Sequence, residues 1–285
     1  MNGGAAVSIL KHYDHDGLYM HYSFDYSPDS GDFQTHFHDR YELLYVKRGK
    51  GRFISEGRIY PLISGAVFIV KRGEMHALEI DSSYPYERMA INFDKRLFEG
   101  IDRSGVLFEP FGRENILYTT VAVTESLDKI CVIPPDVRGE PLRLRILTHL
   151  ATALLEIANA YQTEGEPYRD IAILNMSVRL AIKYIHDNLF MHLTLDEIAR
   201  ASFMSKSHIS RVFREITGKT VWEYITLKRL IAAHRRLARG EAPAEVAKAC
   251  GFQYYSTFWR TYKKVFGYSP SQHLKTGSSG DMIVF

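Results

Sequence analysis

The sequence predicts a multi-domain α+β protein, with an N-terminal antiparallel β-barrel, a helical segment after it and an all-α C-terminal domain. Three observations predict this order. Short strand-like runs fill residues 18–93, an amphipathic helical pattern covers 141–162, and the segments from 171 onward have helical periodicity. The 285 residues suffice for two domains, and an apolar content of 46% provides a core for each.

The expected N-terminal strands are short and rich in Tyr, Phe, Ile and Val, and Gly, Pro, Asp or Ser separates them at regular intervals. This pattern is typical of an antiparallel sandwich or barrel, to which we assign residues 1–115. Gly49 and Gly51 are expected to flank one tight turn, and Ser64–Gly65 to form another. The strand-like runs are 18–26, 41–49, 50–62, 65–73 and 76–81.

The helical segment, assigned to 116–168, carries an apolar seam with alternating spacings of three and four residues. Two interpretations fit the seam: it packs on the barrel of its own chain, or it joins two copies of the chain. We favour the second interpretation and expect a homodimer. Residues 163–168, TEGEPY, are expected to form a linker. The seam consists of Leu147, Leu150, Leu154, Ile157 and Tyr161.

Bulk properties exclude several classes of protein. No apolar run approaches the ~18 residues that a membrane span requires, and the first 17 residues lack the apolar stretch of a signal peptide. The two cysteines, Cys131 and Cys250, do not make a disulfide framework. A reducing, cytoplasmic setting without a membrane partner is therefore expected.

Charge is distributed unevenly, although the net charge is only +3. Between Ser177 and Lys275 there are 17 Lys and Arg against 7 Asp and Glu, a net charge of +10, so the rest of the chain carries −7. A basic C-terminal third attached to an acidic remainder indicates a polyanion-binding module joined to a second function.

This basic third contains one helical unit twice. DEIARASFMSKSHISRVFREITG, residues 196–218, aligns with AEVAKACGFQYYSTFWRTYKKVFG, residues 244–267, with one residue added at the turn. Each copy is expected to be a helix-turn-helix, whose second helix enters the DNA major groove. The matched pairs are Glu197 and Glu245, Ala199 and Ala247, Ser202 and Cys250, Ile209 and Phe258, Arg211 and Arg260, Phe213 and Tyr262, and Gly218 and Gly267.

A stiff helix is expected between the two copies, from Val221 to Arg239, with Gly240 ending it. Its 19 residues span about 28 Å at ~1.5 Å per residue, which is comparable to the ~34 Å repeat of B-DNA. A spacer of this length places the two second helices in successive major grooves on one side of the duplex.

Residues 175–275 resemble the C-terminal domain of the AraC/XylS family of bacterial transcription regulators, on the motifs EVAKACGF, STFWRTYKKVFGYSPSQH and ISRVFREITG. We assign residues 169–276 to this DNA-binding domain and 277–285 to a tail. Lys206, Lys263 and Lys264 are expected to contact phosphates. By position, the resemblance implies base contacts from Ser207, Ser210, Arg211, Tyr255, Ser256, Thr257, Trp259 and Arg260. The two arginines are favoured because a guanidinium binds guanine with two hydrogen bonds.

A polar cluster lies among the N-terminal strands. His36, His38 and Glu42 share parity, so on one strand they face the same way, and GEMH supplies His76 as a fourth group. Three interpretations stay open: a metal-free pocket for a small hydroxylated ligand, a divalent transition metal on these four residues, and a structural cluster with Glu42 paired to an arginine. We favour the metal-free pocket and expect no cofactor. Its wall is expected to include Tyr22, Phe24, Arg40 and Tyr45.

The same stretch resembles a cupin barrel. His36, His38, Glu42 and Gly49 match the first cupin motif, whereas the second is partial, with Lys71 and Ile80 in place of its proline and asparagine. A cupin-like domain is the usual sensor of sugar-responsive AraC/XylS members. A cupin enzyme would use the same groups around a metal with open coordination positions, but duplicated DNA-reading helices do not fit an enzyme. An architectural DNA binder with a vestigial barrel is the other alternative.

Together these features predict a ligand-responsive transcription regulator and not an enzyme. We expect it to bind double-stranded DNA and a small-molecule effector, with a sugar favoured. The resemblance implies activation of metabolic, carbohydrate-related genes through contact with RNA polymerase. An effector changes the arrangement of the domains only if it binds one arrangement better than another, and we expect this change at the linker 163–168.

Overall fold

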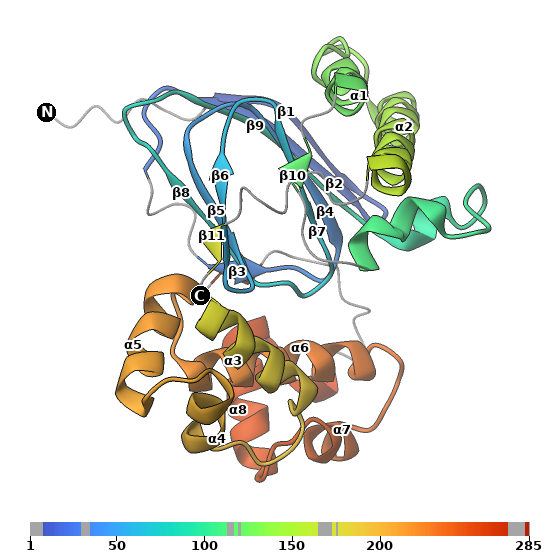
Figure 1. Cartoon of the computed structure of the whole chain (residues 1–285). Coiled ribbons are helices and arrows are strands. Elements are labelled where there is room, and N and C mark those ends of the chain that lie inside the picture. Colours follow the sequence, from blue (N-terminus) through green and yellow to red (C-terminus); the bar gives the residue numbers. More distant parts are fainter. Residues whose placement is uncertain are drawn as a thin grey trace, which may run out of the picture.

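The structure, a computed structural model, describes residues 8–29, 35–112, 117–118, 121–164, 173–174, 176–272 and 283–284. Two antiparallel β-sheets form the N-terminal domain, helices α1 and α2 lie against one of them, and helices α3 to α8 form the C-terminal domain (Figure 1). The predicted multi-domain α+β fold is therefore confirmed.

The first sheet has the strand order β1-β2-β9-β4-β7-β10 and the second has β11-β6-β5-β8-β3-β12. Among the described strands no hydrogen-bonded pair joins the two sheets, so they face each other without closing into a continuous barrel. The first sheet comprises β1 (Ser8–His15), β2 (Leu18–Asp25), β4 (Tyr41–Arg48), β7 (Ala66–Val70), β9 (Tyr86–Phe93) and β10 (Leu117–Tyr118). The second comprises β3 (His36–Phe37), β5 (Gly51–Ser55), β6 (Arg58–Leu62), β8 (His76–Ile80), β11 (Ile173–Leu174) and β12 (Ile283–Val284).

All the strand-like runs of the sequence are strands, but two features differ from expectation. The run 50–62 is a hairpin, because Glu56 and Gly57 both have positive φ angles, 46° and 76°, as a two-residue type I′ turn requires. Strand β1 lies outside the predicted strand region. Most of its side chains are exposed, so it lacks the alternation of apolar and polar residues that marks a half-buried strand.

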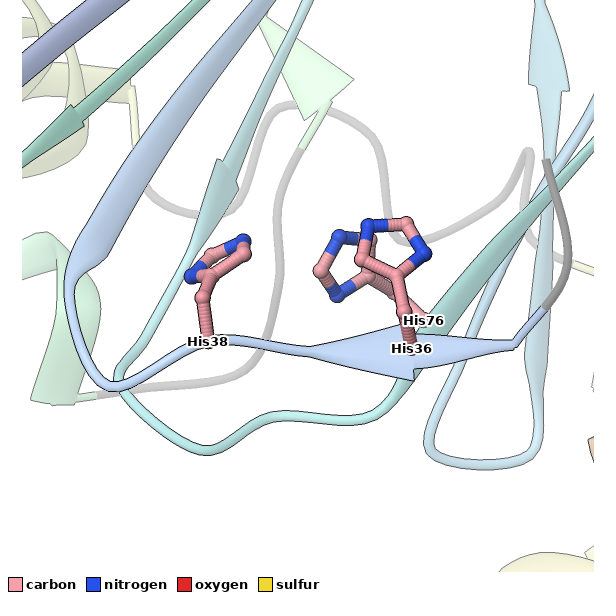
Figure 2. Close-up of side chains that lie close together, drawn as sticks. All are labelled: His36, His38 and His76. Carbon is pink, nitrogen blue, oxygen red and sulfur yellow. The ribbon is translucent and has the colours of Figure 1, made fainter. Parts of the chain in front are cut away.

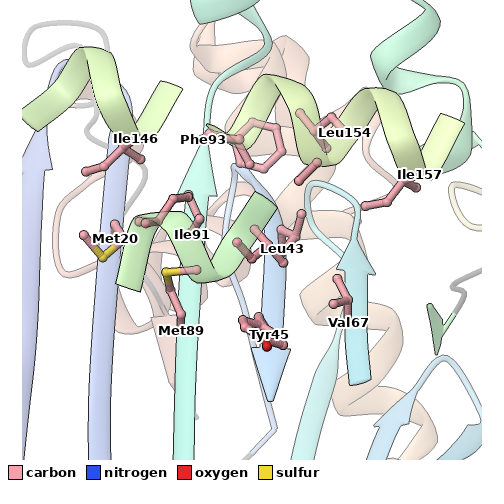
Figure 3. Close-up of a cluster of buried hydrophobic side chains, with 14 of the residues drawn as sticks. Met20, Leu43, Tyr45, Val67, Met89, Ile91, Phe93, Ile146, Leu154 and Ile157 are labelled. Atoms are coloured by element: carbon pink, nitrogen blue, oxygen red, sulfur yellow. The ribbon is translucent and has the colours of Figure 1, made fainter. Parts of the chain in front are cut away.

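The N-terminal domain has two apolar cores. One lies between the sheets and includes Leu44, Phe53 and Phe68. The other lies between the first sheet and helices α1 (Val121–Cys131) and α2 (Gly139–Glu164), where Ile146, Leu154 and Ile157 of α2 meet side chains of the strands (Figure 3).

The apolar seam of residues 141–162 belongs to this second core. Leu150, Leu154, Ile157 and Tyr161 are buried in it, and Leu147 packs against it. The seam therefore packs on the sheet of its own chain and not on a partner, because the exposed apolar face of the sheet needs a cover. The expected linker 163–168 lies mostly outside the described residues, since α2 extends to Glu164.

The C-terminal domain consists of α3 (Met176–Asp187), α4 (Leu195–Ala201), α5 (Lys206–Thr217), α6 (Val221–Leu237), α7 (Pro243–Ala249) and α8 (Tyr255–Phe266). Helix α4 begins with a capping box, in which the Thr194 side chain accepts from the Glu197 amide and the Glu197 carboxylate accepts from the Thr194 amide. The spacer α6 has 17 residues, two fewer than expected, because residues 238–240 form a turn.

Candidate nucleic-acid interface and ligand site

The two sequence copies fold alike. Helices α4 and α7 both end in a left-handed residue, Phe203 with φ 56° and Gly251 with φ 78°. The next amide, of Met204 or Phe252, then donates back to the carbonyl of Ala199 or Ala247, at 3.0 Å in each copy. This matching geometry confirms that one helix-turn-helix unit is used twice.

The second helices, α5 and α8, also end alike. Gly218 and Gly267 have φ angles of 69° and 81°, and their amides donate to the carbonyls of Arg214 and Lys263, at 2.9 Å in each copy. In this position a glycine amide donates to a carbonyl of the last helical turn. The left-handed backbone conformation that this requires would strain other residues.

The expected faces of α5 and α8 are confirmed. Ile209, Phe213, Phe258 and Tyr262 are fully buried. The predicted base-contacting residues lie outside the cores: Ser207, Arg211, Tyr255, Ser256, Thr257 and Arg260 are exposed, and Ser210 and Trp259 are half-buried. The predicted phosphate-contacting residues Lys206, Lys263 and Lys264 are exposed.

The two favoured arginines are held by weak local contacts. Arg211 pairs with Glu215 at 3.3 Å in solvent, and the Nε of Arg260 donates to the Ser256 carbonyl at 3.4 Å. An exposed ion pair of this kind contributes at most about 1 kcal/mol. Both guanidinium groups can therefore exchange these contacts for a base edge at low cost.

One arginine joins the two copies through α6. The guanidinium of Arg229 donates to the carbonyls of Leu189 at 2.8 Å, Gly251 at 2.8 Å and Met191 at 2.7 Å. The segment after α3 and the turn of the second copy are thereby tied to the same turn of α6. This contact, which the repeat alignment did not reveal, fixes how the second copy sits on the spacer.

The N-terminal histidines form the cluster that the motif predicted. His36 of β3 and His38, just after this strand, project to the same side, and His76 of β8 lies beside His36 (Figure 2). One ring nitrogen from each histidine lies within 4.8 Å of the others. Oε2 of Glu42 lies 2.9 Å from Nε2 of His38 and 3.1 Å from Nε2 of His76. Glu42 is therefore paired with histidines, not with the arginine that the structural interpretation assumed.

The protonation of this cluster follows from its hydrogen bonds. Nδ1 of His38 and Nδ1 of His76 face the carbonyls of Arg40 at 3.0 Å and Glu74 at 3.1 Å, and a carbonyl only accepts, so both Nδ1 atoms carry hydrogen. A neutral ring then presents an Nε2 lone pair to the Glu42 carboxylate, which is repulsive. A proton or a metal cation between these atoms removes the repulsion.

The pKa values shift in the direction that this arrangement requires. Burial alone raises the pKa of Glu42, but the charge and hydrogen bonds of His38 and His76 hold it well below its ordinary value. Burial lowers the pKa of His76, but the hydrogen bond and charge of Glu42 raise it above its ordinary value. The cluster therefore favours a carboxylate surrounded by positive charge.

Two buried donors have no hydrogen-bond partner among the described residues, one beside Glu42 and one on the residue whose carbonyl accepts from His38. Asn92 of β9 stands directly opposite Glu42 of β4, is 9% exposed and leaves its Nδ2 unpaired. Nε of Arg40, a residue that is 8% exposed, is also unpaired. An unsatisfied buried donor is costly, so these groups favour a bound polar ligand. Sequence reasoning missed Asn92 because its position depends on strand register.

The expected wall of the pocket is wrong for three of its four residues, Tyr22, Phe24 and Tyr45. Tyr22 and Tyr45 belong to the core beneath α1 and α2, on the sheet face that points away from the cluster. The Tyr22 hydroxyl donates to Glu87 at 2.5 Å, and the Tyr45 hydroxyl donates to Asp128 of α1 at 3.2 Å. Phe24 shares the parity of Tyr22, and its ring contacts that of Tyr26 at 4.6 Å. Parity alone did not show which face of these strands is internal.

Comparison with known families covers both domains. Residues 22–163 match the AraC-like ligand binding domain, and residues 198–276 match a helix-turn-helix domain. The chain belongs to the AraC family of transcriptional regulators, as its motifs predicted. Members of this family are regulators that bind DNA and small-molecule effectors.

Relatives extend over most of the chain. The Msm operon regulatory protein of Streptococcus mutans is 24% identical over 260 residues, which cover 90% of this chain and 91% of the relative. The lactose operon transcription activator of Staphylococcus xylosus is 20% identical over 236 residues, which cover 81% and 82%. Among solved structures, an apo ToxT variant from Vibrio cholerae is similar, with 13% identity, coverage of 93% and 99%, and a TM-score of 0.43. In the described part of the chain, no helix is long and apolar enough to cross a membrane.

Proposed function

We propose that this regulator activates transcription of carbohydrate-related genes in response to a small polar effector. The matching copies of the helix-turn-helix, with both favoured arginines exposed, carry the DNA-binding part of this proposal. The similarity to an operon regulatory protein and to a lactose operon activator supports the activating role and the carbohydrate connection. Contact with RNA polymerase belongs to the same proposal.

Base reading by the first copy is tested with Arg211→Ala. We expect affinity for the cognate site to fall by about 1–3 kcal/mol, with relaxed choice at one base position, because a bidentate contact to guanine is lost. Lys263→Ala is the matched contrast: it should weaken cognate and random DNA alike and reduce the salt slope by about 1. Equal losses for Arg211→Ala on cognate and random DNA would show that this arginine does not read bases.

The effector is proposed to bind at the cluster of His36, His38, Glu42 and His76, with Asn92 and Arg40 as further donors. Hydroxyl groups suit this set, because they accept from the unpaired donors and donate to the carboxylate. We expect His36→Ala to abolish the effector response and to leave DNA affinity unchanged, since His36 is only half-buried. A variant that no longer folds would instead support a structural role for the cluster.

A bound metal is a second candidate occupant, and the donor set fits one. Three imidazoles and a carboxylate suit a divalent transition metal, and the carbonyls that accept from Nδ1 of His38 and His76 orient the two rings, as metal-binding histidines usually require. A metal here would supply a positive charge that holds a hydroxylated ligand. Elemental analysis of protein purified without added metal distinguishes the candidates: a stoichiometric transition metal supports this occupant, and its absence supports the metal-free pocket.

Dimer formation is proposed to use the outer face of α2. The seam is covered by the sheet, but Leu144 and Leu155 are exposed on the opposite side, with Thr148 and Thr152 between them. Leu155→Glu should shift the protein toward monomer in sedimentation, whereas Val132→Glu, at another exposed apolar position, should not. An unchanged dimer in Leu155→Glu excludes this face.

A further inference from the structure

The N-terminal domain is docked on the spacer helix α6 through a buried ionic contact. Glu56, in the turn between β5 and β6, accepts hydrogen bonds from the Tyr224 hydroxyl and the Lys228 ammonium. The side chains of Glu56 and Lys228 are 15% and 11% exposed. A buried charge pair is strongly destabilised when one partner is removed, so this contact depends on its geometry.

A second contact comes from the loop between β7 and β8. The carbonyl of Gly73 accepts from Nζ of Lys228 at 3.2 Å, and the carbonyl of Arg72 accepts from Arg235. A Cβ atom on Gly73 would lie 2.5 Å from Cγ2 of Ile231, so the loop backbone lies directly on α6. Met75, the last residue of this loop, is buried in the core formed by α3 to α6.

The docked domain also touches the C-terminal ends of both DNA-reading helices. The Thr35 hydroxyl donates to the carbonyl of Thr217, the last residue of α5, at 3.1 Å. Phe37 of β3 is buried in the core of the first copy, and its ring lies 6.3 Å from that of Phe266, the last residue of α8. One strand of the N-terminal domain therefore contacts both copies.

The same backbone segments hold the histidine cluster. The Gly73 amide donates to the carbonyl of His38 at 2.8 Å, and Nδ1 of His76 donates to the carbonyl of Glu74 at 3.1 Å. Asp39, next to His38, accepts from Arg235 of α6 at 3.2 Å. A change in the cluster that moves β3 or the 71–75 loop must therefore alter contacts with α6.

We infer that the docked N-terminal domain holds the two helix-turn-helix copies in the relative position that paired major grooves require, and that the 71–75 loop couples the histidine cluster to this docking. This inference rests on the proposed function and adds the direction of regulation: docking favours DNA binding. The predicted base-contacting side chains are accessible while the domain is docked, because it touches the opposite ends of α5 and α8. Holding two sites in their bound geometry reduces the entropy cost of binding both at once.

The test compares two glycine substitutions in the full chain. Gly73→Ala and Gly65→Ala both place a side chain at a positive φ angle, 69° and 85°, but only the Cβ of residue 73 meets α6, because nothing lies within 4 Å of the other. Affinities are measured for a duplex selected in vitro by the wild-type protein and for the same duplex with one half-site scrambled. We expect Gly73→Ala to bind the full duplex at least about fivefold more weakly than Gly65→Ala, and the scrambled duplex equally well.

A second pair of variants uses charge and avoids backbone strain. Glu56→Gln leaves Lys228 without its partner, whereas Glu79→Gln makes the same change in an exposed pair with Arg52, away from α6. Of this pair, only Glu56→Gln is expected to bind the full duplex more weakly while binding the scrambled duplex equally well. If the two variants of each pair bind the full duplex with equal affinity, the inference is overturned. Tighter binding by Gly73→Ala or Glu56→Gln than by its control also overturns it, because docking would then inhibit DNA binding.

Hydrogen exchange separates this inference from the proposed function. If the wild-type protein selects no specific duplex, the proposed function itself fails. If it does, we expect the selected duplex to increase protection of the Gly73 amide in the wild type and less so in Glu56→Gln, because coupling between two sites is reciprocal. If the protein binds DNA specifically but protection of the Gly73 amide does not change, the proposed function stands and the inferred coupling is refuted.

Discussion

Phe203 and Gly251 occupy equivalent positions in the turns of the two copies, and both have left-handed backbone conformations. Phe203 is 86% exposed, so its ring loses little burial when it is removed. We expect Phe203→Gly to raise the free energy of unfolding by about 1 kcal/mol, because glycine adopts this conformation without strain. Chemical denaturation checks this. Gly251→Ala should lower the free energy of unfolding, since its Cβ would lie 2.9 Å from the Phe190 carbonyl oxygen. If Phe203→Gly destabilises the protein instead, the ring of Phe203 makes a stabilising contact.

At the same scale, the sequence identified the chemistry of the ligand site but not its wall. Close spacing in the sequence brought His36, His38 and Glu42 together, although they lie on β3, on the turn after it and on β4 and not on one strand as expected, and a second motif added His76. Asn92 joins them through pairing of β9 with β4, which lie far apart in the sequence. Tyr22 and Tyr45 were misplaced because a strand with apolar residues on both faces does not reveal which face lines the pocket.

At the scale of the elements, one side chain ties α6 to the segments around it. Arg229 donates to three carbonyls that precede or follow other helices. We expect Arg229→Met to lower the free energy of unfolding by about 2 kcal/mol, because methionine keeps the apolar stem but leaves the half-buried carbonyls of Leu189 and Gly251 unsatisfied, while water can replace the contact to the exposed Met191. Arg239→Met, at an exposed position just after the helix, should change it by less than about 0.5 kcal/mol. Similar losses for the two variants would show that the three hydrogen bonds add no net stability.

The helical repeat was predictable because each copy carries its own caps, turns and buried positions, which are local signals. Two N-terminal elements were not predicted in this way. Strand β1 is joined to β2 by Asp16–Gly17, with φ angles of 47° and 77°. This dipeptide is a strong hairpin signal, and it indicates a strand before it even though that strand is exposed and shows no alternation of apolar and polar residues. The seam on α2 has the same spacing whether it covers a sheet or a second helix, so only the tertiary structure distinguishes the two cases.

For the whole molecule, domain docking should depend on pH. Burial alone raises the pKa of Glu56, but Lys228, followed by His186 and Tyr224, lowers it to about 2 from its ordinary 4.5. A lowered folded-state pKa stabilises the fold above pH 4.5, and this contribution is lost as the pH falls from 4.5 toward 2. We expect Glu56→Gln to cost about 3 kcal/mol near neutral pH and progressively less below pH 4.5.

Thermal unfolding of Glu56→Gln and wild type across this pH range measures the effect. Glu79→Gln serves as the control for the same chemical change at an exposed site. A difference between wild type and Glu56→Gln that stays constant down to pH 3 would mean that folding does not lower the pKa of Glu56. Contacts of this kind join residues that are far apart in the sequence, such as Glu56 and Lys228, so no local pattern revealed them.

The burial of Phe37 and Met75 within the helical core limits which domains can be exchanged between regulators. A chimera that joins this DNA-binding domain to a foreign sensor would leave Ile231 and its neighbours against an unmatched surface. Recombination within the family is then productive only when those two side chains, or replacements of similar shape, are inherited together with the helices that receive them.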